Sequence, residues 1–233
     1  MSDVDVIDIS HWQADVEFEK VRESGVIGVI LKCTEGTSYL DPTYDERVDA
    51  ALKAELMVGA YHFLKHGNIG KQMAWFVEEA GLPAGSRLVI DYEDAACTLH
   101  DLEEAIAELS LIDSSMQICI YCGGLLKGQV KQGTAYPWLS ATALWLAHYA
   151  PKPTWPQWIW PTWSLWQYTD KGKVPGVSGD CDCNEFNGSA DDCARWLGPV
   201  VPEPVAEQEM IIRLDFAAPP NVRVRLIVND QEV

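Results

Sequence analysis

The sequence has few basic residues and no long apolar run. Lys and Arg account for 17 of its 233 residues and Asp and Glu for 35, so the formal net charge is -18. Phosphate binding depends on clustered Lys and Arg, and this balance therefore argues against a nucleic-acid partner. No stretch reaches the roughly 18 uninterrupted apolar residues that a membrane-spanning helix needs. We expect no integral membrane segment.

The chain also lacks a recognisable leader and a cysteine framework. Its first residues are acidic, with neither a basic segment nor an apolar signal core, so we expect no signal peptide. Seven cysteines are an odd number, which disfavours a set of disulfides. Cys119-x-x-Cys122 and Cys181-x-Cys183 raise a zinc or redox site as an alternative. Zinc usually takes four ligands in paired short spacings, and burial is the simpler account of Cys119. We expect no metal and no other cofactor.

Strand and helix patterns alternate through the first half of the chain. Strands are predicted near residues 4–8, 26–32, 58–63, 87–92 and 117–121. Helices are predicted near residues 15–24, 41–56, 68–79 and 101–113, the second of them opened by an Asp41-Pro42 cap. Beyond Gly133 the helical periodicity fades, but strand-like segments continue at 144–147, 164–168 and 179–186. This order predicts an α/β fold with a parallel sheet, an irregular (β/α)8 TIM-like barrel with few helices in its second half. Its active site would lie at the carboxyl ends of the strands.

The end of the chain reads as a separate piece. A helix near residues 189–197 completes the barrel, so residues 1–197 are predicted to form one domain, and the prolines of 198–209 predict a stiff linker. Residues 210–233 contain two alternating runs around AAPPN, the pattern of a β-hairpin extension. A lone hairpin is marginal in water, so it either docks on its own barrel or mediates self-association through strand edges.

The most informative segment is LVIDYED at residues 88–94, where an apolar run ends in three carboxylates around one aromatic residue. Alternate side chains of a strand share a face, so Asp91 and Glu93 are expected to project the same way, about 6 to 7 Å apart at their bases. Glycosidases hold carboxyl groups at about that distance or a little less. A solvated loop whose acids cap the next helix is the alternative, and the rest of the chain must decide.

Further segments at the predicted strand ends carry the decision. They are VIDISHWQ at residues 6–13, LKCTEG at 31–36, GAYHF at 59–63, DYE at 91–93, IY at 120–121, LWLAHY at 144–149, LWQYT at 165–169 and DCNEF at 182–186. Together and in this order they resemble the family 25 glycoside hydrolases, the lysozymes with a D-x-E motif that include many phage endolysins. The resemblance covers about residues 4–197.

The resemblance implies hydrolysis of the β-1,4 bond after N-acetylmuramic acid in peptidoglycan. It implies that Glu93 is the general acid, that Asp91 steers the 2-acetamido group of the substrate in a neighbouring-group mechanism, and that Asp8 and Asp182 are flanking acids. Crowded carboxylates raise the pKa of at least one of them, which keeps an acid protonated near neutral pH. Retention and inversion both stay open, because substrate-assisted enzymes fall outside the carboxylate distance rule.

Substrate-binding side chains are expected at the same strand ends. They are Tyr61, His62, Tyr121, Trp145, Trp166, Gln167 and Asn184. The aromatic residues either stack on sugar rings or fill the barrel, and we favour sugar contact. His62 is interpreted as an orienting residue. The dense run Trp155, Trp158, Trp160 and Trp163 is either a glycan platform or packing that replaces missing helices, and packing is favoured for at least half of it.

These observations predict an endolysin-type muramidase whose partner is the glycan strand of bacterial peptidoglycan. Such an enzyme would stay in the host cytoplasm until a separate membrane lesion releases it to the cell wall. A non-catalytic peptidoglycan-binding or phage-structural protein that retains the barrel is the alternative. It is disfavoured because a binding module has no need for four buried acids. A chitinase-like enzyme is disfavoured because its D-x-x-D-x-D-x-E run does not occur in the sequence.

Overall fold

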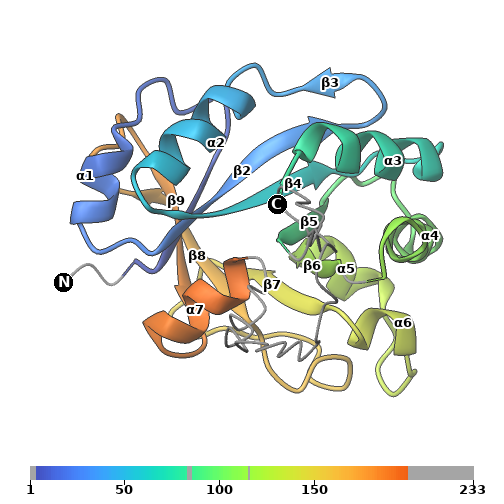
Figure 1. Ribbon diagram of the computed structural model, residues 1–233. Coiled ribbons are helices and arrows are strands. Elements are labelled where there is room, and N and C mark those ends of the chain that lie inside the picture. The colour runs from blue at the N-terminus through green and yellow to red at the C-terminus, as the bar shows by residue number, and fades with distance from the viewer. Residues whose placement is uncertain (1–3, 83–85, 115, 199–233) are drawn as a thin grey trace, which may run out of the picture. The chain divides into compact units, whose positions relative to one another are not determined.

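The computed structural model describes residues 4–82, 86–114 and 116–198 (Figure 1). These residues all belong to one unit, Met1–Val200, and the remaining unit is Val201–Val233. The predicted hairpin at 210–233 and all but the first residue of the predicted linker lie outside the described residues. The boundaries of the three predicted domains therefore stay a prediction.

Within the described residues, nine strands form one sheet in the order β1-β9-β8-β7-β6-β5-β4-β2-β3, and β1 also pairs with β2. This pairing closes eight strands into a barrel. They are β1 (Val6–Ile9), β2 (Gly28–Glu35), β4 (Met57–Phe63), β5 (Arg87–Tyr92), β6 (Gln117–Cys122), β7 (Ala143–Ala147), β8 (Leu165–Gly172) and β9 (Cys181–Phe186). The two-residue strand β3 (Tyr39–Leu40) pairs with β2 outside the closed ring. The predicted irregular eight-stranded barrel is confirmed.

One strand departs from the predicted parallel sheet. β9 runs antiparallel to both of its neighbours, β1 and β8. The reason is the short connection over residues 173–180, because a parallel crossover needs about a dozen residues or more. Asp182 consequently lies near the start of β9 and not at a carboxyl end. Since β9 is reversed, its start reaches the same end of the barrel as the carboxyl ends of the other strands.

The helices are concentrated in the first half of the chain, as expected (Figure 1). They are α1 (Phe18–Glu23), α2 (Tyr44–Lys53), α3 (Ile69–Ala80) and α4 (Leu99–Ile112), followed by the short α5 (Gly124–Gln129) and α6 (Pro137–Ser140) and the closing α7 (Ala190–Leu197). The predicted cap of α2 is wrong. Asp41 accepts bonds from the backbone and hydroxyl of Thr43 and from the backbone of His11, so it ties two loops together before the helix begins.

Alternation along the strands separates two apolar clusters. Val6, Ile30, Val89 and Leu165 pack inside the barrel, where Leu197 of α7 joins them, whereas Ile7 and Ile90 belong to the cluster with the outer helices. Close packing at this closed end requires glycine at position 28, because a Cβ there would lie 2.5 Å from Leu197 Cδ1. The opposite end of the barrel stays open for a site.

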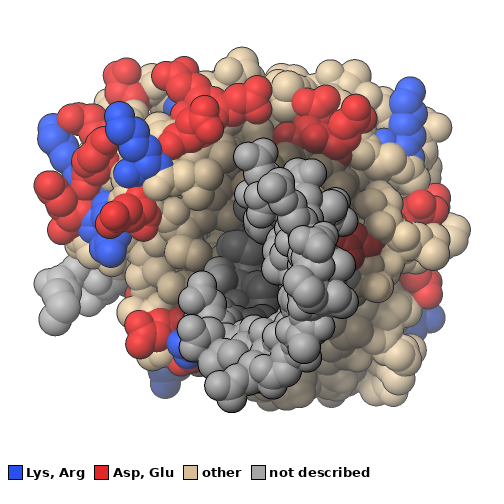
Figure 2. Space-filling view, viewed as in Figure 1, with Lys and Arg blue, Asp and Glu red and all other residues tan. Residues whose placement is uncertain are grey.

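The surface reflects the acidic composition. Figure 2 shows Asp and Glu side chains gathered over the part of this face where α1 and α2 lie, with fewer Lys and Arg among them. No helix in the described part of the chain is long and apolar enough to cross a bilayer.

Candidate active site

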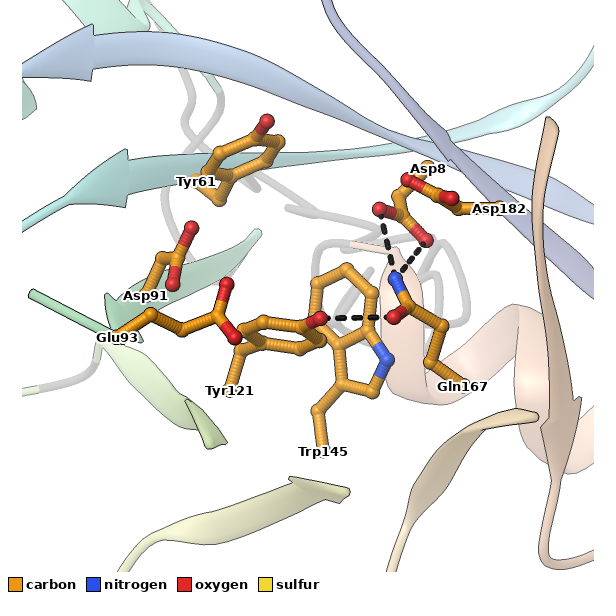
Figure 3. A pocket seen from close by; sticks show the side chains of 8 residues that line it. All are labelled: Asp8, Tyr61, Asp91, Glu93, Tyr121, Trp145, Gln167 and Asp182. Atoms are coloured by element: carbon orange, nitrogen blue, oxygen red, sulfur yellow. Dashed lines mark hydrogen bonds between the residues drawn. The ribbon is translucent and has the colours of Figure 1, made fainter. Parts of the chain in front are cut away.

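A pocket opens at the barrel end where β5 delivers its final acids (Figure 3). It is lined by Asp8, Tyr61, Asp91, Glu93, Tyr121, Trp145, Gln167 and Asp182. Figure 3 shows two carboxyl pairs on opposite sides of it, Asp91 with Glu93 and Asp8 with Asp182. All four acids predicted from the sequence are therefore brought to one site.

Asp91 and Glu93 face the pocket because alternate side chains of β5 point into the barrel. Val89 faces the barrel interior, so Asp91 two residues later faces the pocket, and Glu93 continues that direction just beyond the strand end. Asp91 is 7% exposed, and its Oδ1 has no hydrogen-bond partner within the described residues. Glu93 is exposed at the mouth of the pocket. A buried carboxylate oxygen without a partner is costly, so Asp91 is arranged for a donor that comes from outside the chain.

A hydrogen-bond network holds the second pair. Gln167 Nε2 donates to both carboxylate oxygens of Asp8, at 3.1 and 3.0 Å, and Asn184 Nδ2 donates to Asp8 Oδ2 at 2.8 Å. The amide oxygen of Gln167 accepts the Tyr121 hydroxyl at 2.7 Å, and that of Asn184 accepts Trp145 Nε1 at 2.7 Å. In both amides the nitrogen donates to Asp8 and the oxygen accepts a bond from an aromatic side chain. These bonds fix the orientation of Asp8 without any ligand.

Every carboxyl group of the pocket has a raised pKa. Burial raises the pKa of Asp8 and of Asp91 well above the ordinary value, and a neighbouring acid, Asp182 for Asp8 and Glu93 for Asp91, adds to each shift. Burial raises the pKa of Asp182 to about 6. Although Glu93 as a whole residue is exposed, desolvation of its carboxyl group, followed by the charge of Asp182, raises its pKa. The pocket therefore holds its carboxyl protons to higher pH than exposed carboxyl groups do, which favours general-acid catalysis.

The predicted substrate-binding residues divide into three groups. Tyr61, Tyr121, Trp145 and Gln167 line the pocket. Asn184 faces the same side but is fully buried behind Asp8, so it positions that carboxylate and does not line the pocket.

His62 and Trp166 lie outside the pocket, which corrects their expected contact with substrate. Each follows or precedes a pocket residue in its strand, so its side chain points to the outer face of the barrel. His62 Nδ1 is 2.7 Å from Thr34 Oγ1 and its Nε2 is 3.0 Å from Gln72 Oε1, and burial lowers its pKa to about 4. Trp166 donates to the His148 carbonyl at 2.7 Å.

Sequence reasoning missed one polar contact of the site. The Tyr149 hydroxyl donates to Gln167 Oε1 at 2.6 Å, although its ring is 54% exposed. Tyr149 stands two residues beyond β7, and its place at a strand end was the signal that could have identified it. Within the described residues, no group of three or more His, Cys, Asp or Glu side chains is arranged to hold a metal ion.

Paired carboxyl groups in a pocket at one end of a closed barrel are the arrangement that glycoside hydrolases use. The family model described as glycosyl hydrolases family 25 matches residues 7–177. Lysozyme M1 of Streptomyces globisporus is 31% identical over 209 residues, which cover 81% of this chain and 69% of that relative. The chain belongs to glycosyl hydrolase family 25.

Solved structures agree with this assignment. A bacterial lysozyme from Streptomyces coelicolor superposes with a TM-score of 0.74 at 27% identity, covering 84% of this chain and 98% of the other. The catalytic domain of an endolysin from a Listeria monocytogenes bacteriophage gives a TM-score of 0.64 at 21% identity, covering 82% and 96%. The second likeness concerns the fold alone.

Proposed function

We propose that this protein is an N-acetylmuramidase that hydrolyses the β-1,4 bond between N-acetylmuramic acid and N-acetylglucosamine in peptidoglycan. The observation that carries the proposal is the pocket itself, in which Glu93 and Asp91 face Asp8 and Asp182 and all four carboxyl groups have raised pKa values. The likeness to lysozymes supports this choice of glycan.

Glu93 is proposed as the general acid, because it combines a raised pKa with exposure at the pocket mouth. Its proton passes to the glycosidic oxygen as the bond from that oxygen to the anomeric carbon breaks. The carbonyl oxygen of the 2-acetamido group forms a bond to the anomeric carbon in the same step. Water then attacks this carbon, the bond from the acetamido oxygen to the carbon breaks and restores the acetamido group, and the proton that the water loses returns to Glu93.

Asp91 is proposed to accept the N–H of the acetamido group through its unpartnered Oδ1. In the free enzyme, burial and the neighbouring Glu93 raise the pKa of Asp91. An N–H donor stabilises the ionised form. Substrate binding would therefore make Asp91 the carboxylate of the pair and leave the proton on Glu93, where it is needed.

The biological setting is proposed to be phage lysis, with release of the enzyme from the host cytoplasm to the cell wall. This setting rests on the resemblance of the sequence to a family that includes many phage endolysins. The reaction itself is tested by analysis of reducing ends after digestion of purified peptidoglycan. Muramic acid termini are expected. Glucosamine termini would instead indicate an N-acetylglucosaminidase, and a digest without new termini would favour the non-catalytic alternative.

A further inference from the structure

A second pocket lies in the tryptophan-rich segment between β7 and β8. It is lined by Lys127, Thr154, Trp155, Pro156 and Trp158, and it shares no lining residue with the carboxyl pocket. The four tryptophans of this segment thus have different roles. Trp160 and Trp163 are buried and serve as packing, as predicted for half of the run, whereas Trp158 is 44% exposed.

Hydrogen bonds fix the Trp155 side of this pocket in place. Trp155 Nε1 donates to the Trp160 carbonyl at 2.9 Å, which holds the indole ring of Trp155 in one orientation. The backbone of Thr154 donates to His148 Nδ1 at 3.2 Å, and the backbone of Ile159 donates to the Pro156 carbonyl at 2.9 Å. A rigid aromatic wall binds a ring at a smaller entropic cost than a mobile one.

Lys127 supplies a cation at the edge of this pocket. Its side chain is half-buried on α5, and among the described residues no carboxylate forms an ion pair with it. Burial lowers the pKa of Lys127, and the neighbouring Cys122 opposes that shift. Among the described residues this ammonium group has no ion-pair partner, and it lies at the edge of an aromatic pocket. It is suited to an anionic group on a ligand.

We propose that the second pocket, lined by Trp155, Trp158 and Lys127, is an accessory glycan site that binds a pyranose ring carrying a carboxylate. The apolar C–H face of the ring packs on the indoles, and the carboxylate pairs with the Lys127 ammonium. This chemistry is that of a muramoyl unit, whose lactyl group or peptide stem bears carboxylates. The ligand assignment rests on the proposed muramidase function, and the site would hold a second part of the same glycan strand.

Indole N–H signals in nitrogen-15 NMR spectra test the two pockets separately. Trp145 reports on the carboxyl pocket and Trp158 on the second pocket, and each signal is assigned with a Trp→Phe variant. The full-length Glu93→Gln protein is titrated with the disaccharide of N-acetylglucosamine and N-acetylmuramic acid, and separately with chitobiose, which has no carboxylate. We expect the muramic acid disaccharide to shift the Trp158 signal and chitobiose to do so several-fold more weakly.

Two substitutions test the walls, with the Trp155 signal as the reporter. Trp158→Ala should weaken binding about tenfold through loss of ring contact, and Lys127→Gln roughly two- to fivefold, as for an exposed ion pair. Lys131→Gln, a charge-matched control on a lysine outside both pockets, should have no effect. If a muramoyl dipeptide with an amide-linked lactyl group binds equally well, the site is supported with the carboxylate supplied by the peptide.

Several outcomes would overturn the accessory site. A Trp145 shift without a Trp158 shift would remove it and leave the proposed function standing, whereas a Trp158 shift alone would support it and count against the carboxyl pocket as the glycan cleft. Equal affinity for chitobiose, or an unchanged affinity in Lys127→Gln, would exclude the carboxylate requirement. If removal of residues 199–233 alone shifts Trp158 and the disaccharide does not, the pocket belongs to the tail of the chain.

Discussion

Asp8 and Asp182 are direct partners across the antiparallel pair of β1 and β9, so two acids face each other at the pocket end of the barrel (Figure 3). Like charges in directly opposed positions destabilise a sheet. The amides of Gln167 and Asn184 offset part of this cost through their bonds to Asp8. A pair held in this way against its own repulsion is best explained by a role in the pocket.

Glu93→Gln keeps the shape of the side chain and removes the acidic proton. Clearing of purified cell walls should fall by roughly a hundredfold or more, the usual scale for loss of a general acid. Glu103→Gln on the exposed face of α4 is the matched control and should keep full activity. Circular dichroism would verify that both variants are folded. Clearing by Glu93→Gln within a few-fold of the unmodified protein would contradict the assignment.

Asp91→Asn should also be severely impaired, by roughly a hundredfold. The amide retains the size of the side chain, but it cannot stabilise positive charge on the acetamido nitrogen as that group attacks the anomeric carbon. Asp8→Asn and Asp182→Asn should lose less, because they do not contact the proposed nucleophile. The measurement is turnover of a soluble glycan fragment by each variant. An Asp91→Asn enzyme more active than Asp8→Asn would reverse the proposed order of roles.

The raised pKa of Asp182 should make the free energy of unfolding depend on pH. Burial raises its pKa in the folded protein to about 6, so the folded state binds more protons than the unfolded state between about pH 4 and pH 6. This contribution to stability is present below pH 4 and is lost as the pH rises through 6. The variant Asp182→Asn should therefore gain stability relative to the unmodified protein from pH 4 to pH 7.

The gain should be on the order of 1 kcal/mol, after allowance for solvent screening of a partly exposed group. Urea unfolding of both proteins at the two pH values measures the difference. Other acids contribute a pH dependence of the opposite sign, and comparison with the variant cancels their contribution. Asp101 is an example, because burial raises its pKa but its bonds to Thr98 outweigh that effect and lower the pKa to about 2. A difference that does not change with pH would show that Asp182 titrates normally.

Much of the site could be predicted from the sequence because it lies on strand ends. Alternate side chains of a strand share a face, so the D-x-E spacing correctly predicted that Asp91 and Glu93 face the same pocket. The same rule places His62, next to Tyr61, and Trp166, next to Gln167, on the opposite face of their strands, and it should have excluded both from the substrate site. The antiparallel direction of β9 could have been predicted from the short connection before it. The alternation of strands and helices earlier in the chain instead favoured a parallel strand. The amide network around Asp8 could not be predicted, because it depends on contacts between residues up to 176 positions apart.

Trp166→Phe tests that correction. Loss of the bond from Nε1 to the His148 carbonyl should reduce the free energy of unfolding by about 1 kcal/mol, the usual net value of such a bond. The KM for glycan should not change, because the ring does not line the pocket. Trp145→Phe is the contrasting variant, since Trp145 lines the pocket and its bond to Asn184 supports the residue that positions Asp8, so activity should change. A raised KM in Trp166→Phe would restore the residue to the substrate site.

Removal of the residues beyond Gly198 tests the predicted division of the chain. The eight strands and the closing helix α7 all lie before this point, so the truncated protein should fold and clear walls. The sequence of residues 210–233 predicts a hairpin that leans on its own barrel or on another chain. Truncation should therefore lower the melting temperature or reduce the solution mass, which calorimetry and light scattering measure. If both stay the same and binding to intact walls is lost, the tail is a targeting element and the interpretation as a docking or pairing hairpin is wrong.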